Sequence, residues 1–375
     1  MRARRTRAWI LAGLAASVAL TVLAAGLAAG RGESERGYVE PRIARYWRAL
    51  DDGSVRCLLC PRSCVVPPGG RGHCGVRENR DGTYYTLVYG NPCAVHVDPV
   101  EKKPFYHFLP TTTAFSIATA GCNLDCRFCQ NWHISQARPE ETYNYRLTPA
   151  ELVDLAERSG SPSIAYTYSE PTVFFEYMLD CARLARERGL RNVYHSNGYI
   201  SPEPLRELCA YLDAANIDLK GFDESYYRQI AGGELAPVLR SLEILREEGV
   251  HLEITTLVVP GRNDDDESLR AMCAWIAEHL GSGTPLHLSR FHPQYRLRNL
   301  PPTPVETLER ARRIALEEGL RYVYVGNVPG HAANSTYCPS CGEMVIRRVG
   351  YAVDPFGIEE GRCAACGAPI EGVWR

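Results

Sequence analysis

The sequence predicts an α/β fold: a partial (β/α)6, TIM-like barrel with a cysteine-rich N-terminal segment and a C-terminal pair of zinc-ribbon or rubredoxin-like knuckles. From about residue 110 the chain alternates short β-branched or aromatic runs with helical stretches, which indicates parallel strands joined by crossover helices. Helix start signals separate these runs, and most cysteines gather into three groups. The strand candidates are residues 114–118, 163–168, 192–195, 215–219, 251–259 and 285–291.

Local chemistry marks where helices begin between these strands. In Thr148-Pro149-Ala150-Glu151 the threonine can cap a helix, the proline suits the first helical position, and the glutamate stands three residues after the cap. Ser201-Pro202 repeats the first two signals. In barrels of this type the chemistry lies at the carboxyl ends of the strands. We therefore look for a site in the residues that follow each predicted strand.

Composition and cysteine grouping divide the chain into parts. The 375 residues and 45% hydrophobic content fit one large globular domain with additions. A formal net charge of −2 offers no broad basic surface, which argues against nonspecific nucleic-acid binding. The expected parts are an N-terminal anchor or signal segment (1–36), a cysteine-rich segment (37–110), a catalytic core (111–330) and a metal-binding ribbon (331–375).

The most informative motif follows the first predicted strand. Cys122, Cys126 and Cys129 have the spacing C-x3-C-x2-C, with the aromatic Phe128 before the third cysteine. Thiolates are the standard ligands of iron–sulfur clusters, and four cysteines complete an ordinary cluster. Three cysteines without a nearby fourth therefore predict a [4Fe–4S] cluster with one iron open to another ligand. A zinc knuckle or ordinary buried thiols are the alternatives.

A second cysteine set lies in the N-terminal segment, at Cys57, Cys60, Cys64 and Cys74. This segment is rich in glycine and proline and has little material for a core of its own. A metal would supply the missing stability, either zinc or an auxiliary cluster. Spacing alone does not separate these two, Cys93 could replace one ligand, and unligated thiols are a third interpretation.

The third set consists of two C-x2-C knuckles, Cys338 with Cys341 and Cys363 with Cys366, separated by 21 residues. This spacing fits a zinc ribbon or a rubredoxin-like site, and zinc is favoured over iron. The ribbon could stabilise the fold or dock a protein substrate. Nothing in the sequence chooses between these roles.

The segments after the later strands carry polar groups to the same end of the predicted barrel. Taken singly each has an ordinary interpretation, such as an Asn-Gly turn or a loop histidine. Five such segments, each after its own strand in the predicted order, favour a common functional site over five unrelated loops. The candidate cofactor contacts are Phe128, Ser169, Glu170, Asn197, Asp218, Lys220 and His292.

The triad and these segments together resemble the radical SAM activating enzymes typified by pyruvate formate-lyase activating enzyme. The segment 168–172, Tyr-Ser-Glu-Pro-Thr, is similar to their Gly-Gly-Glu-Pro motif, and segments 196–198, 218–220 and 258–261 are similar to their Thr-Asn-Gly, Asp-x-Lys and Val-Pro-Gly motifs. The resemblance covers roughly residues 50–340.

A closer resemblance is to the radical SAM proteins of the AmmeMemoRadiSam system. It is carried by the cysteine spacing at 57–64, by residues 98–107 (Asp-Pro-Val-Glu-Lys-Lys-Pro-Phe-Tyr-His) and by Gln-Asn-Trp at 130–132. His195 and Ser196 stand where the formate-lyase activators carry an Asp-Thr pair that helps to bind a monovalent cation. We therefore do not expect that cation here.

These resemblances imply that residues 111–330 are a radical SAM core. The open iron would chelate the amino and carboxylate groups of S-adenosylmethionine (SAM), and Glu170 would hold its ammonium. One electron would cleave SAM into methionine and a 5′-deoxyadenosyl radical, which abstracts hydrogen from an unknown substrate, for example a protein as in glycyl-radical activation. A reductase or flavodoxin-like protein is the expected electron donor. The alternative is a catalytically inactive metal-binding scaffold.

The N-terminus predicts a membrane association. Residues 8–30 are apolar or small apart from one serine and one threonine, and as a helix these 23 residues would reach about 35 Å, enough to cross a core of about 30 Å. Four arginines precede the run, which by the positive-inside rule keeps the N-terminus in the cytoplasm. That orientation would place the catalytic body on the outer side of the membrane. The cluster chemistry instead favours a catalytic body on the reducing, cytoplasmic face. A cleaved signal peptide and a wrongly chosen start codon are the alternatives.

Overall fold

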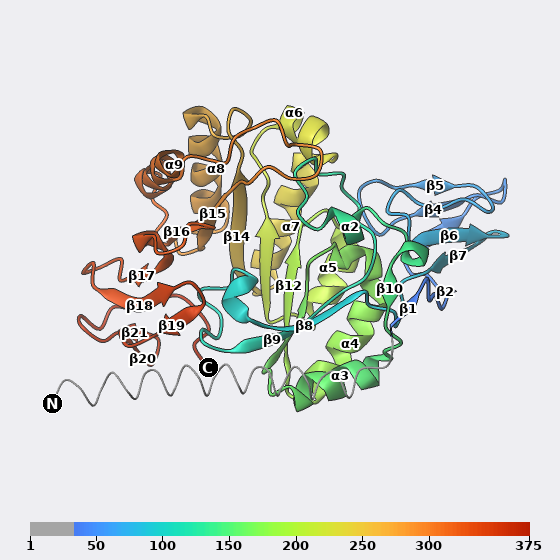
Figure 1. Cartoon of the computed structure of the whole chain (residues 1–375), viewed down its shortest axis with the longest axis horizontal. Helices are drawn as coiled ribbons and strands as arrows, with labels where there is room; N and C mark the ends of the chain where they lie inside the picture. Colours follow the sequence, from blue (N-terminus) through green and yellow to red (C-terminus); the bar gives the residue numbers. More distant parts are fainter. Residues whose placement is uncertain (1–33) are drawn as a thin grey trace.

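The computed structural model describes residues 34–375 and is built around an eight-stranded sheet of order β16-β15-β14-β13-β12-β11-β9-β8 (Figure 1). All six predicted strands are present. Seven strands are parallel, and β8 pairs antiparallel with β9 at one edge. The strands are β8 (Ala94–Pro99), β9 (Thr113–Ala118), β11 (Ser163–Tyr166), β12 (Arg191–Ser196), β13 (Ala214–Asp218), β14 (His251–Val258), β15 (Leu286–Arg290) and β16 (Val323–Gly326).

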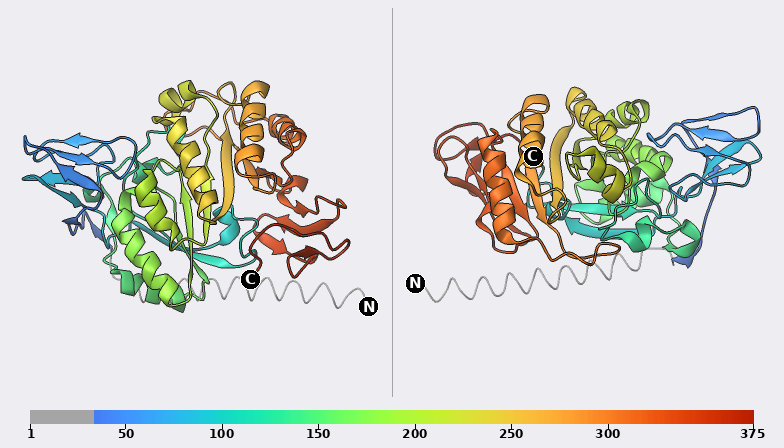
Figure 2. Two further views of the ribbon diagram at one scale, coloured as in Figure 1. Left: turned by 180° about the vertical axis from the view of Figure 1, so that it is seen from behind. Right: turned by 90° about the horizontal axis from the view of Figure 1, so that it is seen from above.

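Helices connect the parallel strands and lie along one side of the sheet (Figures 1 and 2). Their inward faces are apolar, so each covers part of the sheet and joins the hydrophobic core. Thr148 caps the first of them as predicted, because its side chain accepts from the amide of Glu151. The long helices are α3 (Pro149–Arg158), α4 (Phe175–Glu187), α5 (Pro202–Cys209), α7 (Leu235–Glu247), α8 (Asp266–His279) and α9 (Val305–Glu317).

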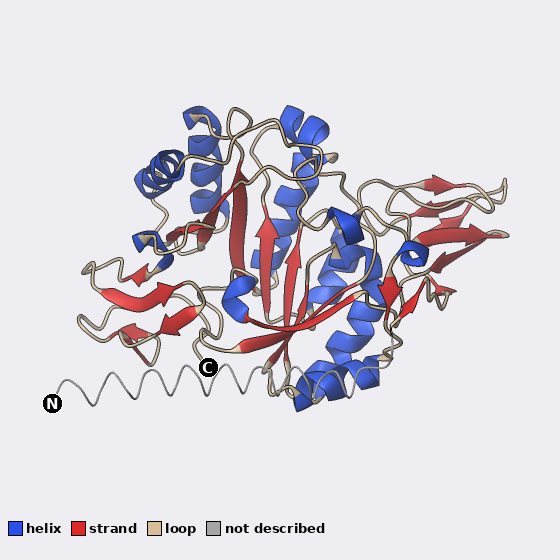
Figure 3. Ribbon diagram, viewed as in Figure 1, coloured by secondary structure: helices blue, strands red, loops and turns tan. Residues whose placement is uncertain are grey.

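Short helical turns shape the loops at both ends of the strands (Figure 3). They are η1 (Val100–Lys102), α2 (Trp132–Ser135), η2 (Pro139–Glu141), η3 (Pro171–Phe174), α6 (Glu224–Tyr226), the π-helical η4 (Tyr227–Ala231) and η5 (Ala332–Asn334).

Polar side chains line the face of the sheet that the helices do not cover. The parallel register places Asn216 beside both His195 and Glu253, and successive residues of a strand point to opposite faces. The segment between β8 and β9 closes the lower part of this face, because the carbonyl of Pro104 accepts from Asn216 at 2.8 Å and the amide of His107 donates to Glu253 at 2.8 Å. The open part therefore lies toward the carboxyl ends of the strands.

The N-terminal part forms three small antiparallel sheets on one flank of the core. A buried ion pair ties it to the core: Arg77 bonds both carboxylate oxygens of Glu176 on α4, at 2.6 and 2.7 Å. These sheets contain β1 (Glu35–Arg36), β2 (Arg42–Ile43), β3 (Trp47–Ala49), β4 (Val55–Cys57), β5 (Val65–Val66), β6 (Arg77–Arg80), β7 (Thr83–Thr86) and β10 (Tyr143–Asn144).

The C-terminal part packs against the opposite flank, near β16 (Figure 1). Arg348 donates to the carbonyl of Tyr106 at 2.7 Å, and Val373 exchanges backbone hydrogen bonds of 2.7 Å with residues 107 and 109. The elements are β17 (Thr336–Tyr337), β18 (Met344–Val349), β19 (Ala352–Asp354), β20 (Ile358–Glu359) and β21 (Arg362–Cys363).

The membrane prediction requires a correction. Within residues 34–375 no helix is long and apolar enough to cross a bilayer. The longest, α8, has 14 residues, or about 21 Å, and exposes a polar face. The predicted span, residues 8–30, lies outside the described residues.

Candidate active site

The C-x3-C-x2-C cysteines lie on the loop directly after β9. Two backbone hydrogen bonds hold this loop from the far side of the site. The amide of Asp125 donates to the carbonyl of Ala231, and that of Arg127 to Ile230, each at 2.9 Å. Both acceptors belong to the π-helical turn η4, and π-helical turns are frequent at functional sites. The cysteine loop is therefore fixed by an element from the β13–β14 connection.

The glycine before the first cysteine is required by close packing. Gly121 has a φ of +96°, and a Cβ there would stand 2.5 Å from Cγ1 of Val76 and 2.8 Å from the carbonyl oxygen of Cys74. Only glycine combines this φ with so close an approach. The N-terminal segment thus packs directly against the start of the cysteine loop.

Hydrogen-bonding groups lie beside all three sulfurs of the triad, and Sγ of Cys126 faces a carbonyl, that of Ala231, at 3.6 Å. The amide of Leu124 donates to Sγ of Cys122 at 3.4 Å, and Nδ2 of Asn197 lies 3.8 Å from the same sulfur. Sγ of Cys129 and Oγ of Ser135 are 3.2 Å apart. Donors aimed at sulfur suit thiolate ligands, because a thiolate accepts hydrogen bonds better than a thiol. The groups beside Cys122 and Cys129 fit thiolate ligands of the predicted [4Fe–4S] cluster.

An ion pair of Lys220 and Asp218 stands beside the second cysteine. Burial raises the pKa of Cys126 to about 12, although the Lys220 ammonium opposes this. Nζ of Lys220 lies 5.8 Å from the centroid of the Phe128 ring and 3.0 Å from Oδ2 of Asp218. Burial alone would raise the pKa of Asp218, but Lys220 and His195 outweigh it and hold this pKa below its ordinary range. The predicted Asp-x-Lys pair is therefore an ion pair next to Cys126.

Glu170 links the loops after β11 and β12. Its Oε1 accepts from the amide of Thr172 at 2.9 Å and from Oγ of Ser196 at 2.7 Å, and its Oε2 accepts from the amide of Asn197 at 2.9 Å. Burial raises the pKa of Glu170, and these donors oppose the shift. Oε2 has a single donor among the described residues, so it can accept one further hydrogen bond.

Two predicted contacts are less well connected. Oγ of Ser169 donates to the carbonyl of Thr119 at 2.7 Å, so its hydroxyl is used within the protein. His292 follows β15 and is exposed. No hydrogen bond or ion pair joins His292 to the other candidates within residues 34–375. The structure thus brings the triad together with Phe128, Asn197, Asp218 and Lys220, with Glu170 behind Asn197, and leaves His292 apart.

The sequence did not predict the contacts that hold Tyr168, two residues before Glu170. Tyr168 has a φ of +65°, which is strained for a bulky residue, and its carbonyl accepts from Nδ2 of Asn131 at 2.7 Å. Its hydroxyl donates to Asp98, and its ring lies 4.0 Å from Nζ of the buried Lys103. The residues at 98 and 103 belong to the stretch that resembles the AmmeMemoRadiSam proteins, which is the signal that could have found them.

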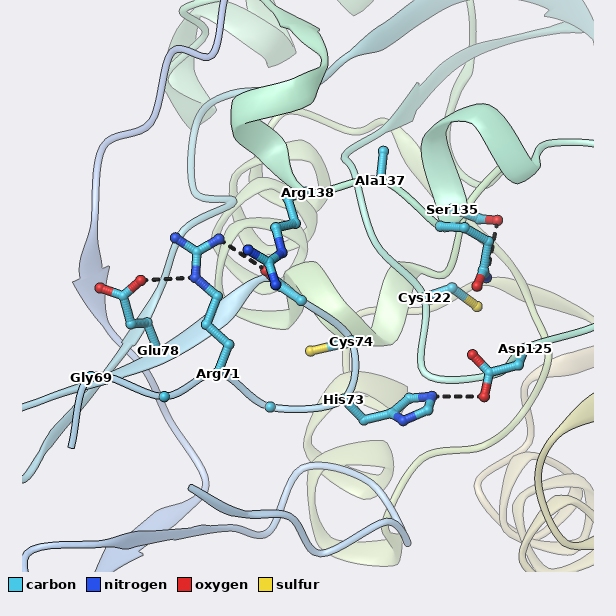
Figure 4. Close-up of a pocket in the computed structure, with 14 residues that line it drawn as sticks. Gly69, Arg71, His73, Cys74, Glu78, Cys122, Asp125, Ser135, Ala137 and Arg138 are labelled. Atoms are coloured by element: carbon cyan, nitrogen blue, oxygen red, sulfur yellow. Dashed lines mark hydrogen bonds and ion pairs between the residues drawn. The ribbon is translucent and has the colours of Figure 1, made fainter. Parts of the chain in front are cut away.

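A cavity of about 630 Å³ opens between the N-terminal segment and the cysteine loop (Figure 4). Cys122 and Cys74 both line it. At its rim His73 pairs with Asp125 at 3.0 Å, and Arg71 pairs with Glu78 of its own segment and with Glu140 of η2. Glu170, Asp218 and Lys220 are not among its lining residues, so this cavity meets the candidate site at the cysteine loop alone.

The C-terminal cysteines form a compact group. The four sulfurs of Cys338, Cys341, Cys363 and Cys366 all lie within 4.8 Å of one another. Two of the sulfur pairs are 3.6 and 3.8 Å apart. Zn–S bonds of about 2.3 Å in a tetrahedron would place the sulfurs about 3.8 Å apart. The set can therefore hold one tetrahedral metal ion.

The comparisons with known proteins agree with this geometry. Residues 116–273, which include the triad and the strand-end residues up to α8, match the family model of the radical SAM superfamily. The chain is also 46% identical over 332 residues to a relative that it covers almost completely. The chain belongs to the radical SAM superfamily and is a radical SAM enzyme.

That relative is the uncharacterized protein MJ0808 of Methanocaldococcus jannaschii, and the match covers 88% of this chain and 99% of the relative. Pyruvate formate-lyase 1-activating enzyme of Escherichia coli is 21% identical over 220 residues, which cover 54% of this chain and 89% of the enzyme. Among solved structures, a radical SAM methyltransferase from Sphaerobacter thermophilus is 16% identical with a TM-score of 0.47, covering 82% of this chain and 81% of that one.

Proposed function

We propose that this enzyme binds a [4Fe–4S] cluster at Cys122, Cys126 and Cys129, cleaves SAM reductively and abstracts a hydrogen atom from its substrate. One observation carries the proposal. Asn197 lies beside Cys122, and Asp218 and Lys220 lie beside Cys126, so these side chains meet on one face of the sheet. When bound, the cluster would pass one electron to the sulfonium of SAM, giving methionine and a 5′-deoxyadenosyl radical that becomes 5′-deoxyadenosine on taking hydrogen from the substrate.

We assign the SAM contacts from the groups left available around the triad. Oε2 of Glu170 would accept from the methionyl ammonium, since it can take one more donor. Lys220, which is buried, and Asp218, which is partly exposed, form an ion pair beside the ring of Phe128, and this polar wall would face the nucleoside. Asn197 would orient Cys122 and one end of SAM. Ser169 would contribute through its backbone, and His292 would have to move inward to reach the same ligand.

The proposed organisation follows from these roles. Residues 111–330 would form the radical SAM core as a partial (β/α)6 barrel, residues 37–110 a cysteine-rich cover, and residues 331–375 a ribbon that binds zinc. The compact group of four C-terminal cysteines supports zinc, because its sulfur separations match a single tetrahedral ion. The stretch 98–107, whose Asp98 and Lys103 support Tyr168, favours the AmmeMemoRadiSam type.

A protein substrate is the second part of the proposal. The E. coli relative is a pyruvate formate-lyase 1-activating enzyme by name, and glycyl-radical activation is the reaction we propose by analogy. The cavity of about 630 Å³ reaches Cys122 from outside and would admit a substrate segment to the edge of the triad. A reductase or flavodoxin-like protein would supply the electron.

The SAM contacts can be tested spectroscopically. We would add SAM labelled with ¹⁵N at its amino group to the anaerobically reduced holoenzyme and record electron–nuclear double resonance. A hyperfine coupling from the label is expected, and Glu170→Gln should weaken it. Absence of coupling in wild type, with the triad cluster fully loaded, would reject SAM chelation and favour a metal-binding scaffold.

A further inference from the structure

The N-terminal cysteines share one pocket. Cys57, Cys60, Cys64 and Cys74 all line it. The four side chains therefore lie together around one pocket, although the cysteines span 18 positions of the sequence.

Two buried donors in the same pocket have no partner. Nε of Arg77 and the hydroxyl of Tyr84 make no hydrogen bond within the described part of the chain, and their residues are 1% and 0% exposed. Glu176 satisfies the other side of the Arg77 guanidinium. Gly72 leaves room for the tyrosine hydroxyl, because a Cβ there would lie 2.6 Å from it. Buried donors are rarely left unpaired, so an acceptor belongs in this pocket.

The spacing of the sulfurs separates a cluster from a single ion. Among residues 34–375 the C-terminal set is the only group of three or more possible ligands whose atoms all lie within 4.8 Å. The sulfurs of the N-terminal set are therefore spread more widely than those of the ribbon, whose spacing matches one tetrahedral ion. The triad at Cys122, Cys126 and Cys129 is spread in the same way. The N-terminal set thus resembles the triad, for which the family implies a cluster, and differs from the ribbon.

We propose that Cys57, Cys60, Cys64 and Cys74 hold a second iron–sulfur cluster, with Arg77 and Tyr84 donating hydrogen bonds to its sulfurs. Four cysteine ligands complete such a cluster and leave no open iron. A cluster with four thiolates carries net negative charge, and the Arg77 guanidinium supplies a buried positive group at the pocket wall.

The second site lies next to the first. Asn123, the neighbour of Cys122, and Thr172 of the Glu170 segment both line the N-terminal pocket. Nε of Arg62 donates to the carbonyl of Asn123 at 2.5 Å, so a hydrogen bond joins the N-terminal cysteine loop directly to the triad loop. As a relay, the second cluster would take one electron from the donor protein and pass it to the triad cluster. This role rests on the proposed function above, whereas the assignment of a cluster to the N-terminal cysteines does not.

The first test counts metals in full-length protein reconstituted anaerobically with iron and sulfide. Removing the triad with Cys122→Ser, Cys126→Ser and Cys129→Ser should leave roughly half of the wild-type iron and acid-labile sulfide, with one zinc per chain. Cys57→Ser with Cys64→Ser should remove the other half and spare the zinc. Loss of all iron and sulfide from the triad variant, or a second zinc per chain in their place, would overturn the proposal.

A milder variant keeps the proposal testable if the cysteine variant misfolds. In the triad-free background, Tyr84→Phe should keep the iron and sulfide content but shift the reduction potential of the remaining cluster to a more negative value, because one hydrogen bond to sulfur is lost. Tyr85→Phe, on the neighbouring and partly exposed side chain, should leave the potential unchanged. An identical potential in all three proteins would show that Tyr84 faces no cluster and would refute the assignment.

Discussion

The amide of Asn197 donates to Oε2 of Glu170 at 2.9 Å, while the side chain of Asn197 reaches Sγ of Cys122. One residue therefore connects the proposed ammonium-binding carboxylate with a cluster ligand. Movement of the loop after β12 would disturb both at once, which explains how three segments far apart in the sequence can act as one site.

Glu170→Gln should weaken SAM binding while leaving the cluster in place. A hydrogen bond to a charged group contributes about 1.5–3 kcal/mol, which corresponds to about one to two decades in Kd. Calorimetric titration of the reconstituted enzyme measures this. Glu253→Gln is the matched control, because Glu253 is also a buried carboxylate but binds residues 106, 107 and 287 away from the triad. Equal SAM affinity in wild type and Glu170→Gln would remove Glu170 from the site.

The triad and the ribbon should respond separately to loss of a ligand. Cys126→Ala should abolish the triad cluster and SAM cleavage, whereas Cys341→Ala should lose only the ribbon metal and lower the Tm. The reason is that the ribbon lies against residues 106–109 at the other end of the strands. Visible absorbance, metal content and thermal unfolding of both variants test this. Equal loss of the triad signal in the two would contradict the division.

Gly121→Ala should be more costly than an ordinary glycine replacement. The control Gly160→Ala also has positive φ, +70°, but open space around it, so it should lose only about 1–2 kcal/mol. At Gly121 the collision with residues 74 and 76 should add about 1–3 kcal/mol and reduce iron loading. Chemical denaturation gives both free energies. Similar losses in the two variants would mean that the contact is easily relieved.

Lys103 should make stability depend on alkaline pH. Burial lowers the pKa of Lys103 to about 8, although Asp98 opposes this shift, whereas an unfolded lysine titrates near 10.4. Between these values the unfolded chain binds more protons, so the free energy of unfolding should rise with pH, by at most about 1.4 kcal/mol per unit. Lys103→Met should remove this slope.

The control for that slope is Lys102→Met. Lys102 also pairs with Asp98, at 2.8 Å, but its side chain is 45% exposed. This variant should therefore keep the rise between pH 8 and 10. A slope that is the same in wild type and Lys103→Met would show that Lys103 is not the group responsible.

The sequence predicted the elements whose signals are local. The six parallel strands and the Thr148 cap each depend on a few neighbouring residues, and each is present. Two further strands of the sheet were missed. β8 precedes the regular alternation and pairs antiparallel, and β16 has only four residues before the ribbon.

Long-range contacts explain what the sequence could not predict. An adjacent lysine pair in a loop is ordinarily solvated, and only the packing of Asp98 and Tyr168 buries Lys103. The positive φ of Tyr168 likewise follows from contacts with Asp98 and Asn131, which lie 70 and 37 positions away. The sulfur spacing that distinguishes the N-terminal set from the ribbon is also tertiary information.

The yield of 5′-deoxyadenosine from anaerobically reconstituted enzyme given SAM and dithionite tests the proposed function most directly. Wild type should form 5′-deoxyadenosine and methionine in equal amounts, Cys126→Ala should form none, and Cys341→Ala should keep the activity. A wild-type enzyme that carries a full triad cluster and binds SAM, yet forms no 5′-deoxyadenosine, would contradict the proposed function.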